Sequence, residues 1–285
     1  MNPVLIVIPL LAVLMFLLGT ELKRSSFVGI VNNPRAVFVG LVGQVVFLPL
    51  IAFALAWAMN LPSTYFMGLV LIACCPGGSS SNIFTLLLKG DVVLSVCLTA
   101  LSSVITLFTL PVIMDFTADF LSCSTGLVVE LPVGKLLMQN LVLLFLPLSL
   151  GFLFRYFFPA KAAATSRVLG KVAFPSLMLL AMLFFLQYPQ EIADNFGTLG
   201  VACSLLICAA MLCSSLLSRV SGVGSGARRT IVIEVGMQNA AQAIAVASSP
   251  FIFNSGEMAV PAIIYALMMN VILLIYVYVL RRCMK

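Results

Sequence analysis

One acidic residue lies deep inside an apolar stretch of the sequence, where charged side chains are rare. Glu234 begins the run EVGMQN over residues 234–239, in which a carboxylate, a glycine and two side-chain amides occupy six positions. An acid at the bilayer centre costs about 2.5–3.5 kcal/mol on insertion scales, so such residues usually mark an ion or substrate path. The alternative is a protonated, hydrogen-bonded acid with a structural role. In either case Glu234 needs an internal cavity or polar partners on other helices.

A second polar interruption lies in an earlier apolar segment, over residues 76–82. Its sequence is PGGSSSN, with apolar residues on both sides. Pro76 removes a backbone donor and clashes with the preceding turn, and two glycines then give the helix little to continue it. We therefore expect a helix that breaks near mid-membrane and restarts, with Ser79 or Ser80 as the cap of the new half. A proline kink that only bends the helix is the alternative.

Hydroxyl and amide side chains accompany these two interruptions. Ser95, Thr99 and Ser102 follow one another at i, i+4 and i+7, which places them on one helix face. Each hydroxyl could instead bond back to a carbonyl of its own helix. The amides Gln44 and Asn270 each lie in a different apolar segment, where they could serve only as contacts between helices.

The chemistry that these groups share is that of hard oxygen donors. Carboxylate, hydroxyl, amide oxygen and freed backbone carbonyl suit a hard cation such as sodium. No Lys or Arg lies at the expected mid-membrane depth. The positive ends of the half-helices are therefore the available anchors for an anionic substrate, with Gly78 and Ser79 in the first interruption and Asn239 in the second.

The composition indicates which class of protein must hold these polar residues in place. The chain has 285 residues, of which 62% are hydrophobic and 8% charged, whereas a soluble domain carries about 25% charged residues. A water-soluble globule is therefore excluded, and little length remains for an extramembrane domain. The sequence has no histidine, so an intramembrane serine enzyme would lack the commonest base. The eight cysteines show no zinc-type spacing and are interpreted as small apolar residues.

The apolar residues fall into nine segments, each long enough to cross a bilayer at about 20 residues per crossing. If the N-terminus lies outside and the C-terminus in the cytoplasm, every basic residue except Lys135 falls on the cytoplasmic side. The net charge of +6 is thus an orientation signal, and a nucleic-acid partner is not expected. The nine segments are 3–20, 34–59, 63–88, 91–114, 134–157, 166–188, 196–219, 228–249 and 257–281.

The two interrupted segments are the third and the eighth. They are five spans apart, and because this number is odd, the two segments cross the membrane in opposite directions. Two interrupted helices of opposite direction are typical of an inverted-repeat secondary transporter with its site at the bilayer midplane. This predicts an all-α polytopic membrane protein whose two broken helices, at 76–82 and 234–239, cross each other.

Two motifs carry a resemblance to a known family. The stretch 74–82, its continuation through Lys89-Gly90-Asp91 to 94–96, and the run 234–239 resemble the bile acid:sodium symporter family. The chain is similar to its bacterial members but with nine spans, because the first of ten helices has no counterpart here. The resemblance implies a panel domain of residues 1–22 and 134–190 and a core domain of residues 34–120 and 195–283. It also implies a plasma membrane location, in bacteria the inner membrane.

The resemblance further implies two sodium ions as coupling ions, with no other cofactor and no obligate protein partner. Substrates of the family range over bile acids, pantoate-like acids and 2-keto acids, and the motifs do not choose among them. An anion exporter of the related arsenite-carrier type is the alternative, although that type places a functional cysteine within the break. The implied first sodium site is Ser81, Asn82, Ser95, Thr99 and Glu234; the second is Gln44, Glu234, Gln238 and the carbonyls of Val235 and Met237; Asn239 and Asn270 would face the substrate.

Overall fold

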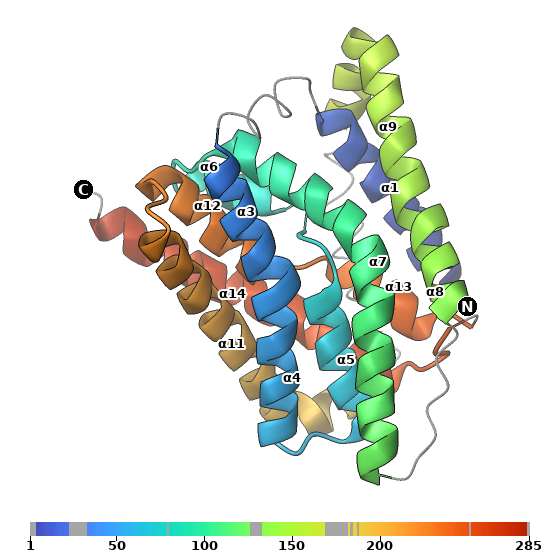
Figure 1. Ribbon diagram of the computed structural model, residues 1–285. Helices are drawn as coiled ribbons and strands as arrows, with labels where there is room; N and C mark the ends of the chain where they lie inside the picture. Colours follow the sequence, from blue (N-terminus) through green and yellow to red (C-terminus); the bar gives the residue numbers. More distant parts are fainter. Residues whose placement is uncertain are drawn as a thin grey trace.

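The computed structural model describes residues 4–22, 33–78, 80–125, 133–168, 182, 185–186, 188–250 and 252–283. Within these residues the regular structure is helical (Figure 1), apart from one isolated β-bridge. The helices are α1 (Val4–Glu21), α3 (Pro34–Val42), α4 (Leu48–Ala58), α5 (Ser63–Cys74), α6 (Ser81–Leu87), α7 (Val92–Thr125), α8 (Val133–Asn140), α9 (Leu146–Phe157), α11 (Pro189–Val220), α12 (Ser225–Gly236), α13 (Ala240–Ser248) and α14 (Val260–Cys283), with short π-helical segments at Gly43–Phe47 and Leu141–Phe145 and a 3₁₀ turn at Glu257–Ala259.

The helices confirm an α-helical polytopic membrane protein. Each predicted apolar segment except the sixth coincides with described helices, and the sixth, 166–188, lies mostly outside the described residues. Two helices are longer than predicted, because α7 continues beyond residue 114 to Thr125 and α11 begins at Pro189, before residue 196. The count of nine spans stays a prediction. Among the described residues, five continuous helical stretches are long and apolar enough to cross a membrane: Pro34–Ala58, Val92–Ser124, Val133–Phe157, Pro189–Val220 and Glu257–Cys283.

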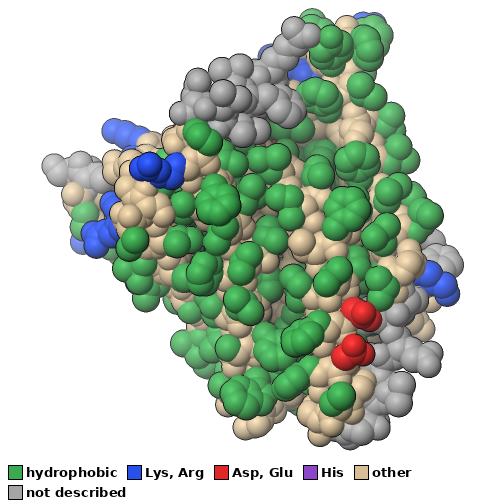
Figure 2. Space-filling view, viewed as in Figure 1, with side chains coloured by type: hydrophobic (Ala, Val, Ile, Leu, Met, Phe, Trp, Pro, Cys, Tyr) green, Lys and Arg blue, Asp and Glu red, His purple; other side chains and the backbone are tan. Residues whose placement is uncertain are grey.

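The outer surface and the ends of the molecule differ in chemistry. Large apolar side chains cover the face shown in Figure 2, and many are well exposed, including Phe38 and Phe116. Such exposure is expected where helices meet lipid rather than water. On this face, basic side chains gather near the ends of α11, α12 and α14, whereas the acidic ones lie toward the opposite end. The basic cluster and the acidic side chains thus lie at different ends of this face, although a further basic side chain lies close to the acidic ones at the right edge of the view.

Helices α1 and α9 form a closely packed pair on one side of the molecule (Figure 1). A Cβ atom added to Gly19 would meet the Leu148 carbonyl, and one added to Gly151 would meet the Phe16 carbonyl. Small residues at such crossings let two helix backbones approach in a membrane. Both helices belong to the predicted panel domain, and the division into panel and core stays a prediction.

The centre of the molecule is built from the interrupted helices. Every residue of α13 is buried, and so are the last nine residues of α5. A helix that is buried on all sides must lie inside a larger helical assembly, and here α4, α7, α11 and α14 supply packing partners for the interrupted helices. The polar residues of the two motifs are therefore placed in the interior.

The orientation can be tested at the two ends of α11. Asp194 and Arg219 are both exposed, and the charge pattern places them outside and inside, respectively. We expect a membrane-impermeant maleimide to label Asp194→Cys in intact cells and Arg219→Cys only after permeabilisation. The background should carry Ser in place of the exposed Cys123, Cys208 and Cys283. The reverse labelling pattern would overturn the predicted topology.

Candidate ion-binding site

The two interruptions meet in the interior and bond to each other. Gly77 and Gln238 form an antiparallel bridge. The Gly78 N–H donates to the Met237 carbonyl at 2.9 Å, and the Asn239 N–H donates to the Pro76 carbonyl at 2.9 Å. Backbone groups freed by a break inside a membrane protein must find partners in protein. The two breaks satisfy this need mutually, which confirms that both helices are interrupted rather than bent.

The breaks are shorter than the sequence predicted. The first extends over residues 75–80, so Ser81 and Asn82 already belong to α6, and the second comprises residues 237–239, so Glu234 and Val235 lie in the last turn of α12. The first helix stops because Cys75 precedes Pro76 and takes an extended conformation, with ψ at 156°. The carboxylate of Glu234 is consequently fixed by helical backbone.

The capping residues differ from the prediction. Ser80 precedes the first residue of α6, but its side chain makes no capping bond, because its backbone is already in the helical region with φ at −69° and ψ at −16°, unlike a typical N-cap residue. Ser79 lies outside the described residues. At the other break Asn239 is the cap, since its Oδ1 accepts from the Gln242 N–H at 3.1 Å.

Glu234 is fully buried at this crossing and is held by hydroxyl groups. Its Oε2 accepts from Ser95 Oγ at 2.9 Å and its Oε1 accepts from Thr99 Oγ1. Ser81 Oγ lies 3.2 Å from Ser95 Oγ, and all four side chains are inaccessible to solvent. Thr99 also bonds the Ser95 carbonyl at 3.1 Å, so back-bonding and contact with Glu234 occur together. Four of the five residues predicted for the first sodium site therefore form one bonded cluster.

The fifth residue, Asn82, bonds in a different direction. Its Nδ2 donates to Glu21 Oε2 at 3.2 Å, which links α6 to the end of α1. Its Oδ1 is buried and has no hydrogen-bond partner. An orphaned acceptor of this kind is what a cation ligand looks like without its ion. Asn82 therefore does not bond to the Glu234 cluster, but its Oδ1 is available as a ligand for a cation.

The residues predicted for the second site form a chain of amides beside the first. Gln44 Nε2 donates to Gln238 Oε1 at 3.4 Å, and Gln238 Nε2 donates to the Val235 carbonyl at 2.9 Å. The Met237 carbonyl receives the Gly78 N–H, and Gln44 Oε1 is buried without a partner. Gln44 lies on the π-helical segment Gly43–Phe47, a geometry frequent at functional sites.

Gly77 lies between the two residue sets. A Cβ atom at this position would overlap Glu234 Oε1 and would lie 3.2 Å from Gln44 Nε2. Only glycine lets the backbone pass this close to the carboxylate. The first interruption therefore needs a glycine because of its neighbours, and both candidate ion sites border this one residue.

The residues predicted to face the substrate are only partly brought together. Asn239 and Gly78 both lie at the crossing, and both are buried. Asn270, on α14, donates to the carbonyl of Ala266 in its own helix at 2.7 Å and makes no printed bond to either break. Asn270 is therefore not joined to Asn239 and Gly78 in the described structure, and Ser79 lies outside the described residues.

Three further residues take part in the site, although they were absent from the predicted sets. Ser102 Oγ accepts the Gly77 N–H at 3.3 Å, and the buried Tyr265 donates its hydroxyl to the Gly236 carbonyl at 3.2 Å. Glu21 bonds Asn82, as described above. The hydroxyl stripe was a usable signal for Ser102, whereas no pattern in the sequence distinguished Glu21 or Tyr265 as a residue of the site.

A cavity of about 470 Å³ lies beside the cluster, between α1, α6, α7 and α9. Its wall includes Glu21, Asn82 and Arg155 among apolar side chains. It therefore reaches both the α1/α9 pair and the first turn of α6. A charged group that entered this cavity would meet the outer side of Asn82.

The bond between Glu21 and Asn82 predicts a measurable effect. We expect Glu21→Ala to lower sodium affinity by several-fold, because Asn82 loses the acceptor that orients its amide. Glu21→Gln keeps an acceptor oxygen and should be milder. Sodium titration by tryptophan fluorescence, using the single Trp57, measures this on purified protein. Equal affinities for wild type and Glu21→Ala would show that the bond has no part in ion binding.

Membrane-length apolar helices around two crossing breaks and a buried carboxylate define a polytopic membrane protein of the transporter class. The family model described as the Sodium Bile acid symporter family matches residues 8–222. The chain belongs to that family, and it is accordingly a membrane transporter rather than an enzyme.

Three curated relatives illustrate the range of the family. The chain is 28% identical to the uncharacterized sodium-dependent transporter YocS of Bacillus subtilis, covering 91% of this chain and 78% of YocS. It is 31% identical to the probable chloroplastic sodium/metabolite cotransporter BASS1 of Arabidopsis thaliana, over 85% of this chain and 58% of that protein. It is 29% identical to the human ileal sodium/bile acid cotransporter, over 81% of this chain and 65% of that protein. The chain thus spans less than two thirds of the plant and human proteins.

Proposed function

We propose that the chain is a sodium-coupled symporter of small organic anions. The observation that carries this proposal is Glu234, a carboxylate buried where two broken helices cross, with only neutral hydroxyl partners among the described residues. An ionised carboxylate at such a site needs a compensating positive charge. A sodium ion supplies that charge, and the names of the relatives YocS and BASS1 point to the same ion.

Two sodium positions are proposed. The first uses the oxygens around Glu234 together with the unpartnered Oδ1 of Asn82. The second also uses Glu234, together with Gln238, the unpartnered Oε1 of Gln44 and the carbonyls of Val235 and Met237. The second lone pairs of these two carbonyls remain available beside their present bonds. Two sodium ions and a monoanion bring a net charge of +1, which offsets the −1 of Glu234.

The proposed mechanism is alternating access by an inverted repeat. In this scheme α1, α8 and α9, with the rest of residues 134–190, act as the panel, and the remaining helices act as the core. The cavity beside α6 separates these two groups, which supports a path between them. The bond between Glu21 and Asn82 would break or form as the two groups move against each other.

The proposed substrate is a carboxylate of the bile acid, pantoate-like or 2-keto acid class. It would bind in the cavity between panel and core, with Asn239 and the N-terminal ends of α6 and α13 directed at its charge. The name of one relative, an ileal sodium/bile acid cotransporter, supports the first of these classes, whereas the name sodium/metabolite cotransporter does not choose among them. Arg155 in the cavity wall offers a further positive charge.

The proposal predicts that substrate binding depends on sodium. If the two ligands are coupled, each raises the affinity of the protein for the other by the same factor. We expect a bile acid, pantoate or pyruvate to raise the melting temperature more in sodium than in potassium or choline, because ligand binding stabilises the folded state by mass action. Calorimetric titration of the responding anion then gives its affinity in each salt. An anion that binds equally well in all three salts would refute sodium coupling.

A further inference from the structure

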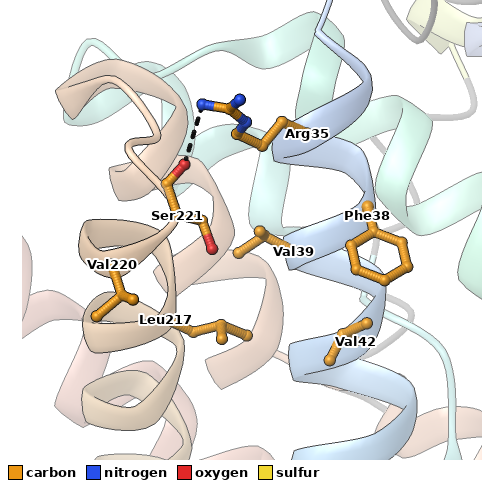
Figure 3. A pocket seen from close by; sticks show the side chains of 7 residues that line it. All are labelled: Arg35, Phe38, Val39, Val42, Leu217, Val220 and Ser221. Carbon is orange, nitrogen blue, oxygen red and sulfur yellow. Dashed lines mark hydrogen bonds between the residues drawn. The ribbon is translucent and has the colours of Figure 1, made fainter.

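A second cavity lies at the end of the molecule where basic residues gather. It has a volume of about 450 Å³ and separates the start of α3 from the end of α11. Figure 3 shows Arg35 reaching across its mouth from α3, with Phe38 and Val42 below it on the same helix. Val220 on α11 and Ser221 just after it form the opposite wall. This cavity is separate from the one that borders Asn82.

The guanidinium of Arg35 places a positive charge at the mouth of the cavity, and some of its N–H donors have no acceptor among the described residues. Arg35 Nη1 donates to the Ser221 carbonyl at 3.4 Å, and the same nitrogen would lie 3.5 Å from a Cβ atom at Gly222. This single contact lays the guanidinium against the turn between α11 and α12. A guanidinium has five N–H donors, and none of the described residues that line the cavity is acidic. Donors therefore remain for an anion.

The walls below Arg35 are apolar and open toward the outer surface. Phe38 is 69% exposed and Val220 is 89% exposed. In a membrane protein, apolar side chains exposed to this degree face acyl chains. Arg219 lies next to Val220, so a second positive charge belongs to the same helix end. The cavity thus combines a cationic mouth with walls suited to hydrocarbon.

We propose that this cavity binds an anionic phospholipid, whose phosphate bonds Arg35 and whose acyl chain lies along Phe38 and Val220. A guanidinium can hold a phosphate through two parallel bonds, which a point charge cannot. Basic pockets between helices on the cytoplasmic side are suited to anionic head groups. The predicted topology places Arg35 on that side. A free phosphate would use only the mouth, whereas a phospholipid also covers the apolar walls.

The occupant would connect α11 with α3, the helix that leads into the π-helical segment carrying Gln44. Val42 lines the cavity, and the following Gly43 packs against α11 and α12, where a Cβ atom would lie 3.6 Å from Ser214 and 3.3 Å from Val235. A lipid bound between α3 and α11 would therefore hold α3, which leads to Gln44, against α11. The lipid site itself does not depend on sodium coupling.

The test is native mass spectrometry of the purified full chain with phosphatidylglycerol and phosphatidylcholine of identical acyl chains. Wild type should retain phosphatidylglycerol in preference to phosphatidylcholine, and Arg35→Gln should reduce that preference by about tenfold or more, the loss expected for one charge-assisted bond. Val220→Glu is a second variant, which places a negative charge at the mouth from a fully exposed position and should have the same effect. Melting temperatures in detergent without added lipid verify that both variants are folded.

The control variant is Arg282→Gln, which removes one positive charge from α14. Arg282 lies over the Tyr278 ring at 4.6 Å and does not line the cavity, so this variant should keep the wild-type preference. The proposal is overturned if Arg35→Gln binds phosphatidylglycerol like wild type, or if Arg282→Gln loses as much. It is also overturned if inorganic phosphate alone protects the detergent-solubilised protein from unfolding as well as phosphatidylglycerol does.

Discussion

Glu234→Gln is expected to abolish sodium-driven uptake while the protein still folds. Glu234 serves both proposed sodium positions and, in the part of the chain that the structure describes, is the one formal charge at the crossing. Glutamine keeps the size and one oxygen, but it offers the ions only a dipole. Removing one partner of a buried ion pair costs about 3–5 kcal/mol. A loss of about 3 kcal/mol weakens sodium binding roughly 150-fold, since 1.4 kcal/mol corresponds to a factor of ten.

The fold should tolerate this change, because a neutral amide is easier to bury than a carboxylate. The measurement is uptake of a verified substrate as sodium is varied, in wild type and variant at matched expression. Ser95→Ala should be milder, since it removes one neutral ligand of several. Asp194→Asn, the same acid-to-amide change at an exposed position, should leave sodium dependence unchanged. An unaltered sodium dependence in Glu234→Gln would mean that the acid is structural and that the site assignment is wrong.

The features predicted correctly from the sequence are those encoded locally. Pro76 and the glycines after it ended a helix where expected, and the spacing of Ser95 and Thr99 placed both hydroxyls on the face that meets Glu234. The exact ends of the breaks were less accurate. Ser81 and Asn82 entered α6, because a helix can begin as soon as the backbone leaves the proline, without a side-chain cap.

The contacts that were missed join residues far apart in the chain. Asn82 and Glu21, whose bond was missed, are 61 positions apart. Gln44 and Gln238 are 194 positions apart, and only the family resemblance, not any pattern of residues, placed them in one site. Periodicity shows which face a residue occupies, but it does not show which helix packs against that face. The bonds between the two breaks also depend on packing, because the Gly78 N–H can reach the Met237 carbonyl only when both helices lie in their final positions. Local patterns therefore predict the components of the site, whereas packing determines their partners.

Gly77→Ala is the second substitution with a large expected effect. The new methyl group would overlap Glu234 Oε1 and press on Gln44 Nε2. Both atoms are at the ends of side chains, so they can move without displacing helix backbone. Glu234, however, is held in place by Ser95 and Thr99, and any movement shifts the carboxylate away from those hydroxyls. The cost therefore falls on the ion sites rather than on the fold.

Overpacking a buried position by one methyl group typically costs about 1–3 kcal/mol. If that cost is met by displacing Glu234, sodium affinity should fall roughly 5- to 150-fold, while the melting temperature without sodium changes little. Sodium titration and thermal unfolding of the purified protein measure the two quantities separately. The matched control is Gly197→Ala on α11, where an added Cβ atom meets nothing within 4 Å, and both quantities should stay at their wild-type values. If Gly77→Ala instead lowers the melting temperature without sodium and leaves sodium affinity intact, Gly77 supports the crossing of the helices and does not shape the ion sites.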